Sequence, residues 1–406
     1  MTGPCLPPNV TPDMLSVGFW LDRAGDSADT PFITPETIPA FNDQVHASID
    51  IPAVLDLPDT LSAARVREQI ARYAPPAETH YGNAGQPLDD GYFAALQENA
   101  SPHLPTPVRF GLAVCRTNVR AFPTHDLVTP QPYAFGFDRL QETTIDPGWS
   151  VAVLGSSSDG LWYFCLTPHY WGWVLAEHIA LGTRQQVKAY TESESFVMTT
   201  AERGLVALAT GSGLAPQMGT RLLLDIQVSE SNSVLIPARL PDGSIKFRDG
   251  IIPPHSDDFY DGYLPCTPRT ILQQAFRLLG SPYAWGGSRL GLYGRDCSRL
   301  VRDVYAVTGV NLPRNSGQQT QIGTDNVIFA PDTSDDTRRN TLTRVPPGAI
   351  LAAPGHVMIY LGHVDGEPYA LHASGAPENG RVIVSDLSLG KEGSLLQRLT
   401  HAIIIS

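Results

Sequence analysis

The sequence predicts a multidomain protein in which two small β-barrels are followed by an α+β domain. Its 406 residues exceed what one hydrophobic core accommodates, so several domains are expected. Two successive blocks, residues 106–185 and 186–255, have the pattern of short strands separated by turns, which is typical of small barrels. Residues 256–406 instead have helical patterns first and strand patterns afterwards, as in an α+β domain. Residues 1–105 form an N-terminal extension.

The composition indicates an ordinary folded protein with an acidic surface. Hydrophobic residues make up 42% of the chain and charged residues 17%, which is usual for a globular protein. The net charge of −13, without any basic run, argues against nucleic acid as a partner. No apolar stretch approaches the roughly 20 residues of a transmembrane helix. Because the first residues lack a signal-peptide pattern, we expect a cell-envelope or periplasmic protein if a signal has been removed, and a cytoplasmic one if the chain is complete.

In the extension, two stretches have helical patterns. A Thr-Pro pair at 34–35 predicts a helix start ahead of Ile38 and Phe41. A second apolar repeat includes Val66 and Ile70 and predicts another helix. The remainder is rich in proline, aspartate and alanine, so we expect it to be irregular.

The two barrel blocks are marked by short apolar runs and by turns of the Asp-Gly type. In the first block the turn is Asp159-Gly160, which directly precedes a strand pattern. In the second block the corresponding turn is Asp242-Gly243. The expected strands are 150–154, 161–166, 204–209, 220–226 and 233–237.

The α+β segment opens with a helix whose start and end are both marked. Thr267 is an N-cap, Pro268 takes the first helical position, and Gly280 ends the apolar repeat. A second helix is expected to follow Asp296. Strands are expected at 349–352, 356–361, 369–372 and 381–384.

Cys297 has the position of a reactive thiol. Asp296 is a good N-cap, which places Cys297 at the first helical position, where the helix dipole favours the thiolate. Glycine-containing loops at 286–287 and 291–294 are expected to keep side chains away, so that a substrate can approach. The other four cysteines are scattered and form no CxxC pair, so no metal site is expected.

A thiol nucleophile needs a base, and two histidines are placed to supply it. His356 begins an apolar strand pattern, and His372 lies on the next strand pattern along the chain. A loop centred on Val364 would place the two side chains directly opposite each other, about 5 Å apart at Cβ. A two-residue turn at 365–366 would place them on opposite faces of the sheet, so their pairing depends on the register.

These residues belong to a set of motifs that resembles the NlpC/P60 family of papain-like cell-wall cysteine peptidases. The motifs occur in the order of the family: Tyr283-Ala284-Trp285-Gly286-Gly287, Asp296-Cys297-Ser298, Leu312-Pro313-Arg314-Asn315-Ser316, Pro347-Gly348, Gly355-His356-Val357 and Leu371-His372-Ala373. The resemblance implies a papain-like α+β fold with Cys297 as nucleophile, His356 as base and His372 orienting that base. It also implies catalysis without metal or cofactor. One departure is Arg299, where the family usually has glycine.

The two barrel blocks resemble the paired bacterial SH3 domains of one branch of this family. The matching parts are 138–143, 159–162 and 172–174. Members of that branch hydrolyse the bond between γ-D-glutamate and the diamino acid in peptidoglycan stem peptides or muropeptide fragments. They tend to require a free N-terminal L-alanine. The resemblance therefore implies peptidoglycan peptides as the partner of this protein.

The same resemblance implies roles for five substrate-binding residues. Asp296 and Ser298 would bind the amine of the substrate, and Glu142 and Tyr170 of the first SH3-like barrel would complete that pocket. The hydroxyl of Tyr283 would assist the backbone N–H of the nucleophile in stabilising the oxyanion. Glu142 is equally compatible with a solvated charge on a strand.

Two other classes of function stay open. The first is a non-catalytic peptidoglycan-binding protein with SH3-like anchors, although the presence of a thiol, two histidines and an acidic cap together argues against it. The second is a thiol amidase or acyltransferase on the same fold, which product analysis would distinguish. The sequence leaves open which diamino acid is recognised and whether intact wall or only released peptides are cleaved.

Overall fold

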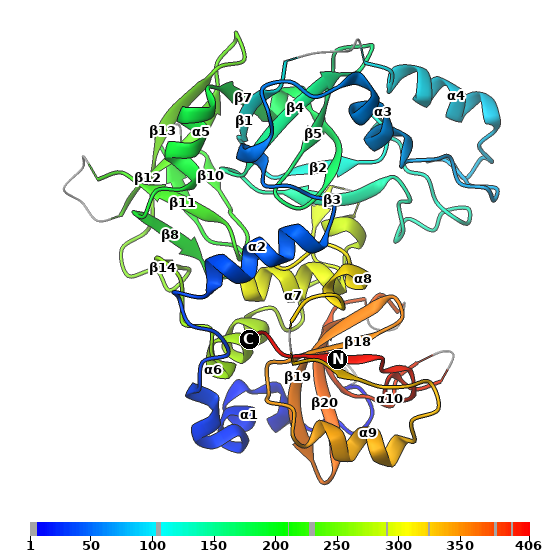
Figure 1. Ribbon diagram of the computed structural model, residues 1–406, viewed down its shortest axis with the longest axis vertical. Helices are drawn as coiled ribbons and strands as arrows, with labels where there is room; N and C mark the ends of the chain where they lie inside the picture. Colours follow the sequence, from blue (N-terminus) through cyan, green and yellow to red (C-terminus); the bar gives the residue numbers. More distant parts are fainter. Residues whose placement is uncertain are drawn as a thin grey trace. The chain divides into compact units, whose positions relative to one another are not determined.

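In the computed structural model the described residues are 6–102, 107–209, 211–226, 232–289, 291–323, 325–376, 380–390 and 393–406, so Cys5 lies outside them. The chain divides into two compact units, both drawn in Figure 1. The C-terminal unit comprises the residues up to Ile49, Tyr263–Tyr283 and Arg295–Ser406. The barrel unit comprises Asp50–Gly262 and Ala284–Gly294. Over the described ranges, no helix is long and apolar enough to cross a membrane.

The barrel unit contains two seven-stranded antiparallel sheets, coloured cyan to light green in Figure 1. The first consists of β1 (Arg109–Ala113), β2 (Thr117–Arg120), β3 (Gln141–Ile145), β4 (Ser150–Ser156), β5 (Trp162–Leu166), β6 (Trp171–Leu175) and β7 (Ile179–Gly182), in the order β3-β2-β6-β5-β4-β1-β7. The second consists of β8 (Phe196–Thr199), β9 (Val206–Leu208), β10 (Gly213–Leu214), β11 (Arg221–Leu224), β12 (Ser233–Arg239), β13 (Ile245–Ile251) and β14 (Phe259–Asp261), in the order β10-β9-β13-β12-β11-β8-β14. The two chain segments follow the same path, which confirms the predicted succession of two small barrels.

Each of the two sheets has its own apolar core. The first core includes Val119, Ile145, Val151, Val153 and Ile179, and the second includes Val206, Leu222, Val234 and Ile236. The first barrel also buries two ion pairs, Arg116 with Asp146 at 3.1 Å and Arg120 with Asp138 at 2.8 Å. Helix α5 (Arg184–Thr191) joins the two sheets and begins with a capping box at Thr183.

The N-terminal extension is divided between the two units. The C-terminal unit contains α1 (Val17–Ala24) and α2 (Ile38–Ser48), and the barrel unit contains α3 (Ala63–Ala71) and α4 (Asp90–Asn99). The predicted helices near Ile38 and Val66 are confirmed as α2 and α3. The start of α2 lies a few residues later than the Thr-Pro signal at 34–35 indicates, whereas Ser62 caps α3 by accepting the N–H of Arg65.

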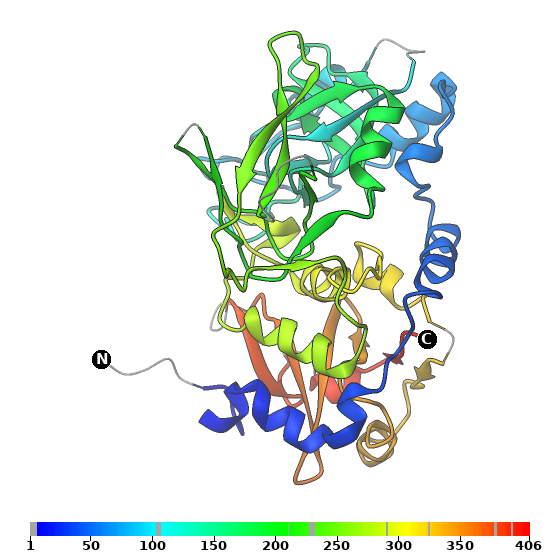
Figure 2. The ribbon, with the colours of Figure 1, turned by 90° about the vertical axis from the view of Figure 1, so that its left-hand side faces the viewer.

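The C-terminal unit has a six-stranded antiparallel sheet with helices around it. The sheet consists of β17 (Val327–Ile328), β18 (Ile350–Ala353), β19 (His356–Val364), β20 (Glu367–Ala373), β21 (Val382–Asp386) and β22 (His401–Ile403), in the order β17-β22-β18-β19-β20-β21. The helices are α6 (Pro268–Arg277), α7 (Cys297–Ala306), α8 (Ser316–Gln319), α9 (Asp335–Leu342) and α10 (Leu395–Arg398). Helix α1 packs against α6, as Figure 2 shows. Helices α6, α7 and α8 precede the strands of this sheet along the chain, and this order confirms the α+β prediction.

Helix α7 packs against the sheet through the apolar stripe that its sequence predicts. The side chains of Leu300, Val301, Val304 and Tyr305 are fully buried, and α7 contacts β19 and β20. Burying four large apolar side chains contributes on the order of several kcal/mol, which fixes the helix and therefore its first residue.

The glycines before α7 serve a different purpose from the one expected. Gly286 and Gly287 have positive φ angles of 59° and 81°, and a Cβ on either would collide with Gln141 or Thr144 of β3. Their small size therefore allows close packing inside the barrel unit. The prediction that they keep this loop open for a substrate is wrong. The segment continues into a short hairpin of β15 (Ser288–Arg289) and β16 (Leu292–Tyr293).

Candidate active site

Cys297 is the first residue of α7, as predicted. Asp296 caps the helix, and its Oδ1 accepts the N–H of Arg299 at 2.9 Å. The sulfur of Cys297 is next to the start of β19, because its thiol points toward the carbonyl oxygen of Gly355 at 4.0 Å and the sulfur accepts the N–H of Val357. The residue between these two backbone groups is His356. The helix start and the strand start thus bring the thiol to the histidine.

The turn of the β19–β20 hairpin is the second of the two alternatives that the sequence left open. The turn is the two-residue type at Asp365-Gly366, with Val364 paired to Glu367. A bulge between Tyr360 and Gly362 then shifts the register by one residue.

This shift returns the two histidines to one face of the sheet. Beyond the bulge, Ile359 pairs with Leu371, so His356 lies two positions from the partner of His372. The two residues are therefore diagonal neighbours on one face, an arrangement that differs from both alternatives, direct opposition and opposite faces. The Nε2 atom of His356 is 2.8 Å from the Nδ1 atom of His372.

A third strand extends this pair of histidines. Ser385 of β21 is fully buried, and its Oγ lies 2.9 Å from the Nε2 atom of His372. Ser385 is not among the residues that the sequence predicts for the site, because its place beside His372 depends on the pairing of β20 with β21. The alternation of residues along β21 was the available signal, since His372 pairs with Ile383 and Ser385 is on the same face two residues later.

One assignment of protons satisfies both hydrogen bonds and leaves Nδ1 of His356 without a hydrogen. In this assignment, Nε2 of His356 donates to Nδ1 of His372, and Nε2 of His372 donates to Ser385 Oγ. The lone pair on Nδ1 of His356 is then available to accept a proton.

Burial favours the neutral forms of Cys297 and His356. Burial, and then the negative charge of Asp296, raises the pKa of Cys297 to about 11. Burial, with a further contribution from the positive charge of Arg398, lowers the pKa of His356 to about 4. Burial of the thiol thus opposes the effect of the helix dipole, which favours the thiolate.

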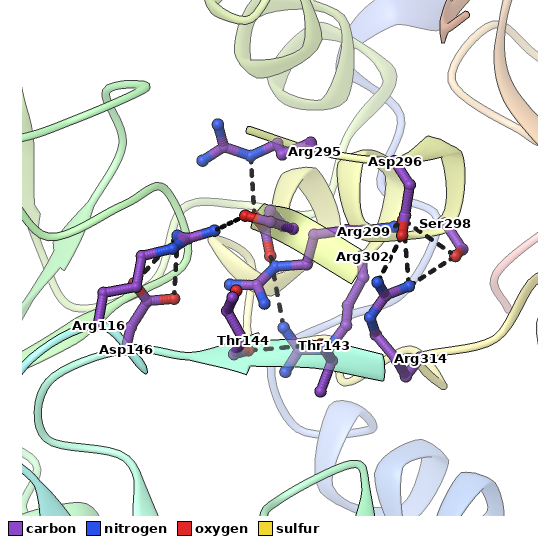
Figure 3. A network of polar contacts seen from close by, with 12 residues as sticks. Arg116, Thr143, Thr144, Asp146, Arg295, Asp296, Ser298, Arg299, Arg302 and Arg314 are labelled. Carbon is purple, nitrogen blue, oxygen red and sulfur yellow. Dashed lines mark hydrogen bonds and ion pairs between the residues drawn. The ribbon is translucent and has the colours of Figure 1, made fainter. Parts of the chain in front are cut away.

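The side chains of Asp296 and Ser298 both accept hydrogen bonds from the guanidinium of Arg314. Arg314 donates to Asp296 Oδ2 at 2.6 Å, to Asp296 Oδ1 at 3.1 Å and to Ser298 Oγ at 2.9 Å (Figure 3). All three side chains are buried. The sequence motif contains Arg314, but its role was missed. The structure places both predicted amine-binding residues together and gives each of them an internal partner.

Comparisons with known proteins identify two domains in the chain. Residues 280–391 match the NlpC/P60 family, and residues 131–175 match an SH3 domain of the SH3b1 type. The chain carries an NlpC/P60 domain. Cys297, His356 and His372 all lie within the matched segment, and so do Asp296, Ser298 and Arg314.

Curated proteins that are named as peptidases match parts of the chain. A gamma-D-glutamyl-L-lysine dipeptidyl-peptidase of Bacillus cereus is 25% identical over 205 residues, which cover 46% of this chain and 56% of that protein. Peptidoglycan endopeptidase RipB of Mycobacterium tuberculosis is 34% identical over 126 residues, which cover 28% and 46%. The bifunctional muramidase/DL-endopeptidase CwlT of Bacillus subtilis is 41% identical over 64 residues, which cover 16% and 17%. The chain thus spans about half or less of the length of these relatives.

Solved structures share the fold beyond the NlpC/P60 domain. An NlpC/P60 endopeptidase from Photobacterium damselae subsp. piscicida has a TM-score of 0.77 at 16% identity and covers 96% of this chain and 97% of its own. An NlpC/P60 family protein from Bacillus cereus has a TM-score of 0.52 at 18% identity and covers 73% and 100%. At these identities the likeness shows the fold, and it confirms the predicted SH3-like and NlpC/P60 arrangement.

Arg299, the departure from the family pattern, lies inside the NlpC/P60 domain and not on its surface. The side chain is fully buried, and its Nε donates to Asp303 Oδ1 at 2.6 Å. The other oxygen of Asp303 accepts Arg295 Nε at 2.9 Å (Figure 3). Arg299 therefore replaces glycine without exposing a side chain beside the nucleophile. The i,i+4 spacing of Arg299 and Asp303 was the sequence signal for this pair.

The remaining predicted residues lie in both units. Tyr283 of the C-terminal unit is near Asp296 and Cys297, because burial and then the charges of these two groups raise the pKa of its phenol. The phenol therefore keeps its proton and can donate. In the barrel unit, the hydroxyl of Tyr170 donates to Glu142 Oε2 at 2.6 Å. Across the described part of the chain, no cluster of three or more His, Cys, Asp or Glu side chains could hold a metal ion.

Proposed function

We propose that this protein is a cysteine endopeptidase that hydrolyses the bond between γ-D-glutamate and the diamino acid of peptidoglycan stem peptides. The observation that carries the proposal is the set of hydrogen bonds joining His356, His372 and Ser385 next to Cys297. A buried thiol beside an oriented neutral imidazole is the arrangement of a nucleophile with its base. The relatives named as peptidoglycan endopeptidases support the substrate class.

In the first step, the thiol proton of Cys297 moves to Nδ1 of His356 while the sulfur bonds to the γ-carbonyl carbon of D-glutamate. The π electrons of the carbonyl group move to its oxygen and give a tetrahedral oxyanion. The hydrogen on Nε2 of His356 stays bonded to His372, so the new imidazolium is held in place.

Two donors serve the oxyanion in this proposal. The backbone N–H of Cys297 is at the start of α7, where the first N–H groups of the helix lack intrahelical acceptors. The protonated hydroxyl of Tyr283 supplies a second hydrogen bond. Both act most strongly on the developing negative charge, because the site is largely shielded from water.

In the second step, the carbonyl group re-forms and the carbon–nitrogen bond breaks. The leaving amine takes the proton from His356, and a thioester remains on Cys297. Water then loses a proton to His356 and adds to the thioester carbon. Collapse of this second intermediate expels the sulfur, which takes back a proton, and releases the peptide with a γ-carboxylate.

The amine requirement is the finer part of the proposal. We assign the free amine of L-alanine to Asp296 and Ser298. A buried ammonium needs a carboxylate partner, and Asp296 can supply one. Asp296 would share its charge between the substrate and Arg314, because the Arg314 ion pair exists without substrate.

The test is mass spectrometry of products from synthetic L-Ala-γ-D-Glu peptides that end in either lysine or diaminopimelate. The expected products are L-Ala-γ-D-Glu and the released diamino acid, and the Cys297→Ala protein is the inactive control. N-acetylation of L-alanine should abolish cleavage. Equal cleavage of the acetylated peptide would refute the amine requirement, and binding without cleavage would indicate a wall anchor. A product joined to an added amine would indicate an acyltransferase.

A further inference from the structure

A polar cavity, separate from the proposed active site, is lined entirely by residues of the barrel unit. Its volume is about 510 Å³, within the range of sites that bind small molecules or peptide ends. It is lined by Asn83, Asn118, Arg120, His125, Leu127, Phe135, Asp138, Gln141, Ser288, Arg289 and Gly291. The proposed chemistry of Cys297 uses none of these residues.

One group of lining side chains is already satisfied. Arg120 donates to Asp138 Oδ2 at 2.8 Å and to Gln141 Oε1 at 3.3 Å, and both ends of the ion pair are buried. Asp138 Oδ1 accepts two backbone N–H groups, from Val128 and Leu140. The carboxylate in this lining is therefore neutralised by Arg120 and has no charge left for a cationic ligand.

A second group keeps hydrogen-bond donors available. Within the described chain, the side chains of Arg289 and Ser288 form no hydrogen bond, and Arg289 is exposed. Asn118 uses its Oδ1 to accept Gln141 Nε2 at 3.3 Å, which leaves the N–H groups of its amide free. The free groups are thus a guanidinium, a hydroxyl and an amide N–H.

The chemistry of these groups selects an anionic, planar ligand. The lining has one cation, Arg289, without a matching carboxylate, so its net charge is positive. A guanidinium with adjacent neutral donors is the usual partner of a carboxylate, which it binds through two parallel hydrogen bonds. Phe135 and Leu127 add an apolar wall for the side chain next to that carboxylate.

We propose that this cavity is a binding site for the terminal carboxylate of a peptide. Arg289 binds the carboxylate, Asn118 and Ser288 donate to it, and Phe135 packs against the last side chain. That the peptide is a stem peptide of the cell wall rests on the proposed function. The chemistry by which the cavity binds a carboxylate does not depend on that function. The site is also close to Cys297 along the sequence. The β15–β16 hairpin that carries Arg289 ends at Tyr293, shortly before Asp296.

The test measures binding by titration calorimetry of the full chain with N-acetyl-D-alanyl-D-alanine and with its C-terminal amide. The acetyl group removes the amine, so neither probe uses the amine site of the proposed function. The acid should bind at least about 10-fold more tightly than the amide, because a charge-assisted bond to Arg289 is lost in the amide. Equal affinities of the two probes would overturn the proposal.

Variants of matched arginines locate the site. Arg289→Gln should weaken binding of the acid about 10-fold or more and bring it to the affinity of the amide. Arg248→Gln is the control, because Arg248 is an exposed arginine on β13 of the second barrel and should leave the affinity unchanged. Asn118→Ala should weaken binding by a smaller factor, about 3-fold to 10-fold.

Three outcomes would contradict the proposal. They are unchanged affinity in Arg289→Gln, an equal loss in Arg248→Gln, or displacement of the acid by a neutral N-acetylglucosamine oligomer, which would make the cavity a glycan site. None of these results depends on turnover. If the natural chain bound the acid but showed no peptidase activity, this result would contradict only the proposed function.

Discussion

The sheet of the C-terminal unit and the first barrel arrange their buried polar groups in opposite ways. On β19, β20 and β21, the side chains of His356, His372 and Ser385 form a linear chain of hydrogen bonds that leaves one nitrogen unused at its end. In the first barrel, Arg120 donates to Asp138, and the remaining oxygen of Asp138 accepts backbone N–H groups, so the carboxylate has no unused acceptor for a ligand. A chain of hydrogen bonds with an unused nitrogen at one end can transfer a proton, whereas a network in which every group is bonded can only stabilise the fold.

This difference predicts where substitutions act. Changes along the chain of hydrogen bonds should lower kcat, because they alter the proton transfer of the chemical step. Changes in the barrel cavity should lower affinity and leave the chemical step intact. A barrel substitution such as Arg289→Gln that lowered kcat would break this comparison.

The largest effect is expected for the base. His356→Ala should lower kcat by about 10⁴-fold or more, because no other group in the hydrogen-bonded chain faces the thiol. His372→Ala should lower kcat by about 10²-fold, because water can replace part of an orienting hydrogen bond. Steady-state kinetics with the free-amine peptide, together with circular dichroism to check folding, tests both. If His372→Ala is the more damaging change, the roles of the two histidines are reversed.

The next effect is expected at the helix cap. Asp296→Asn should lower kcat/KM for the free-amine peptide by about 100-fold, because both the substrate amine and Arg314 lose a buried anionic partner. Asparagine can still cap α7, so the helix should persist. The comparison peptide has its amine acetylated. A residual rate on that peptide that is equally sensitive to Asp296→Asn would limit Asp296 to the cap and the Arg314 ion pair.

The position of the proposed nucleophile, Cys297, could be predicted from the sequence because it is set locally. An aspartate followed by an apolar stripe defines a helix start within a few residues, and the structure has that start at Cys297. The register of His356 and His372 could not be settled in the same way. The Asp-Gly turn alone predicts opposite faces, and only the bulge next to Gly362 restores the shared face.

Other features depend on contacts between segments distant in sequence. Gly286 and Gly287 look like loop residues, but their size is required by the approach of β3. Arg314 looks like a surface residue after a turn, but it is buried against Asp296. Local patterns give the elements and their ends. Partners of buried charges follow from packing, which a single sequence does not display.

A smaller effect is expected at the far end of the catalytic chain. Ser385→Ala should lower kcat by about 10-fold without changing KM, because His372 loses the acceptor that fixes its tautomer. Ser374→Ala is a matched control, since Ser374 is also a buried serine beside the same strands and should change kcat less than about 2-fold. A change in KM, or equal losses in the two variants, would assign Ser385 to packing and not to the proton chain.

The smallest effect is a pH dependence of stability. The pKa of His356 is about 4 in the folded protein and about 6.5 when unfolded, so between these values only the unfolded state takes up a proton. The stabilisation is therefore fully present above about pH 6.5 and is lost as the pH falls toward 4, by on the order of 3 kcal/mol. Urea unfolding at several pH values should show a weaker acid dependence in His356→Gln than in the natural chain. Identical slopes would mean that the pKa of His356 is the same in the folded and the unfolded chain, so that burial does not lower it.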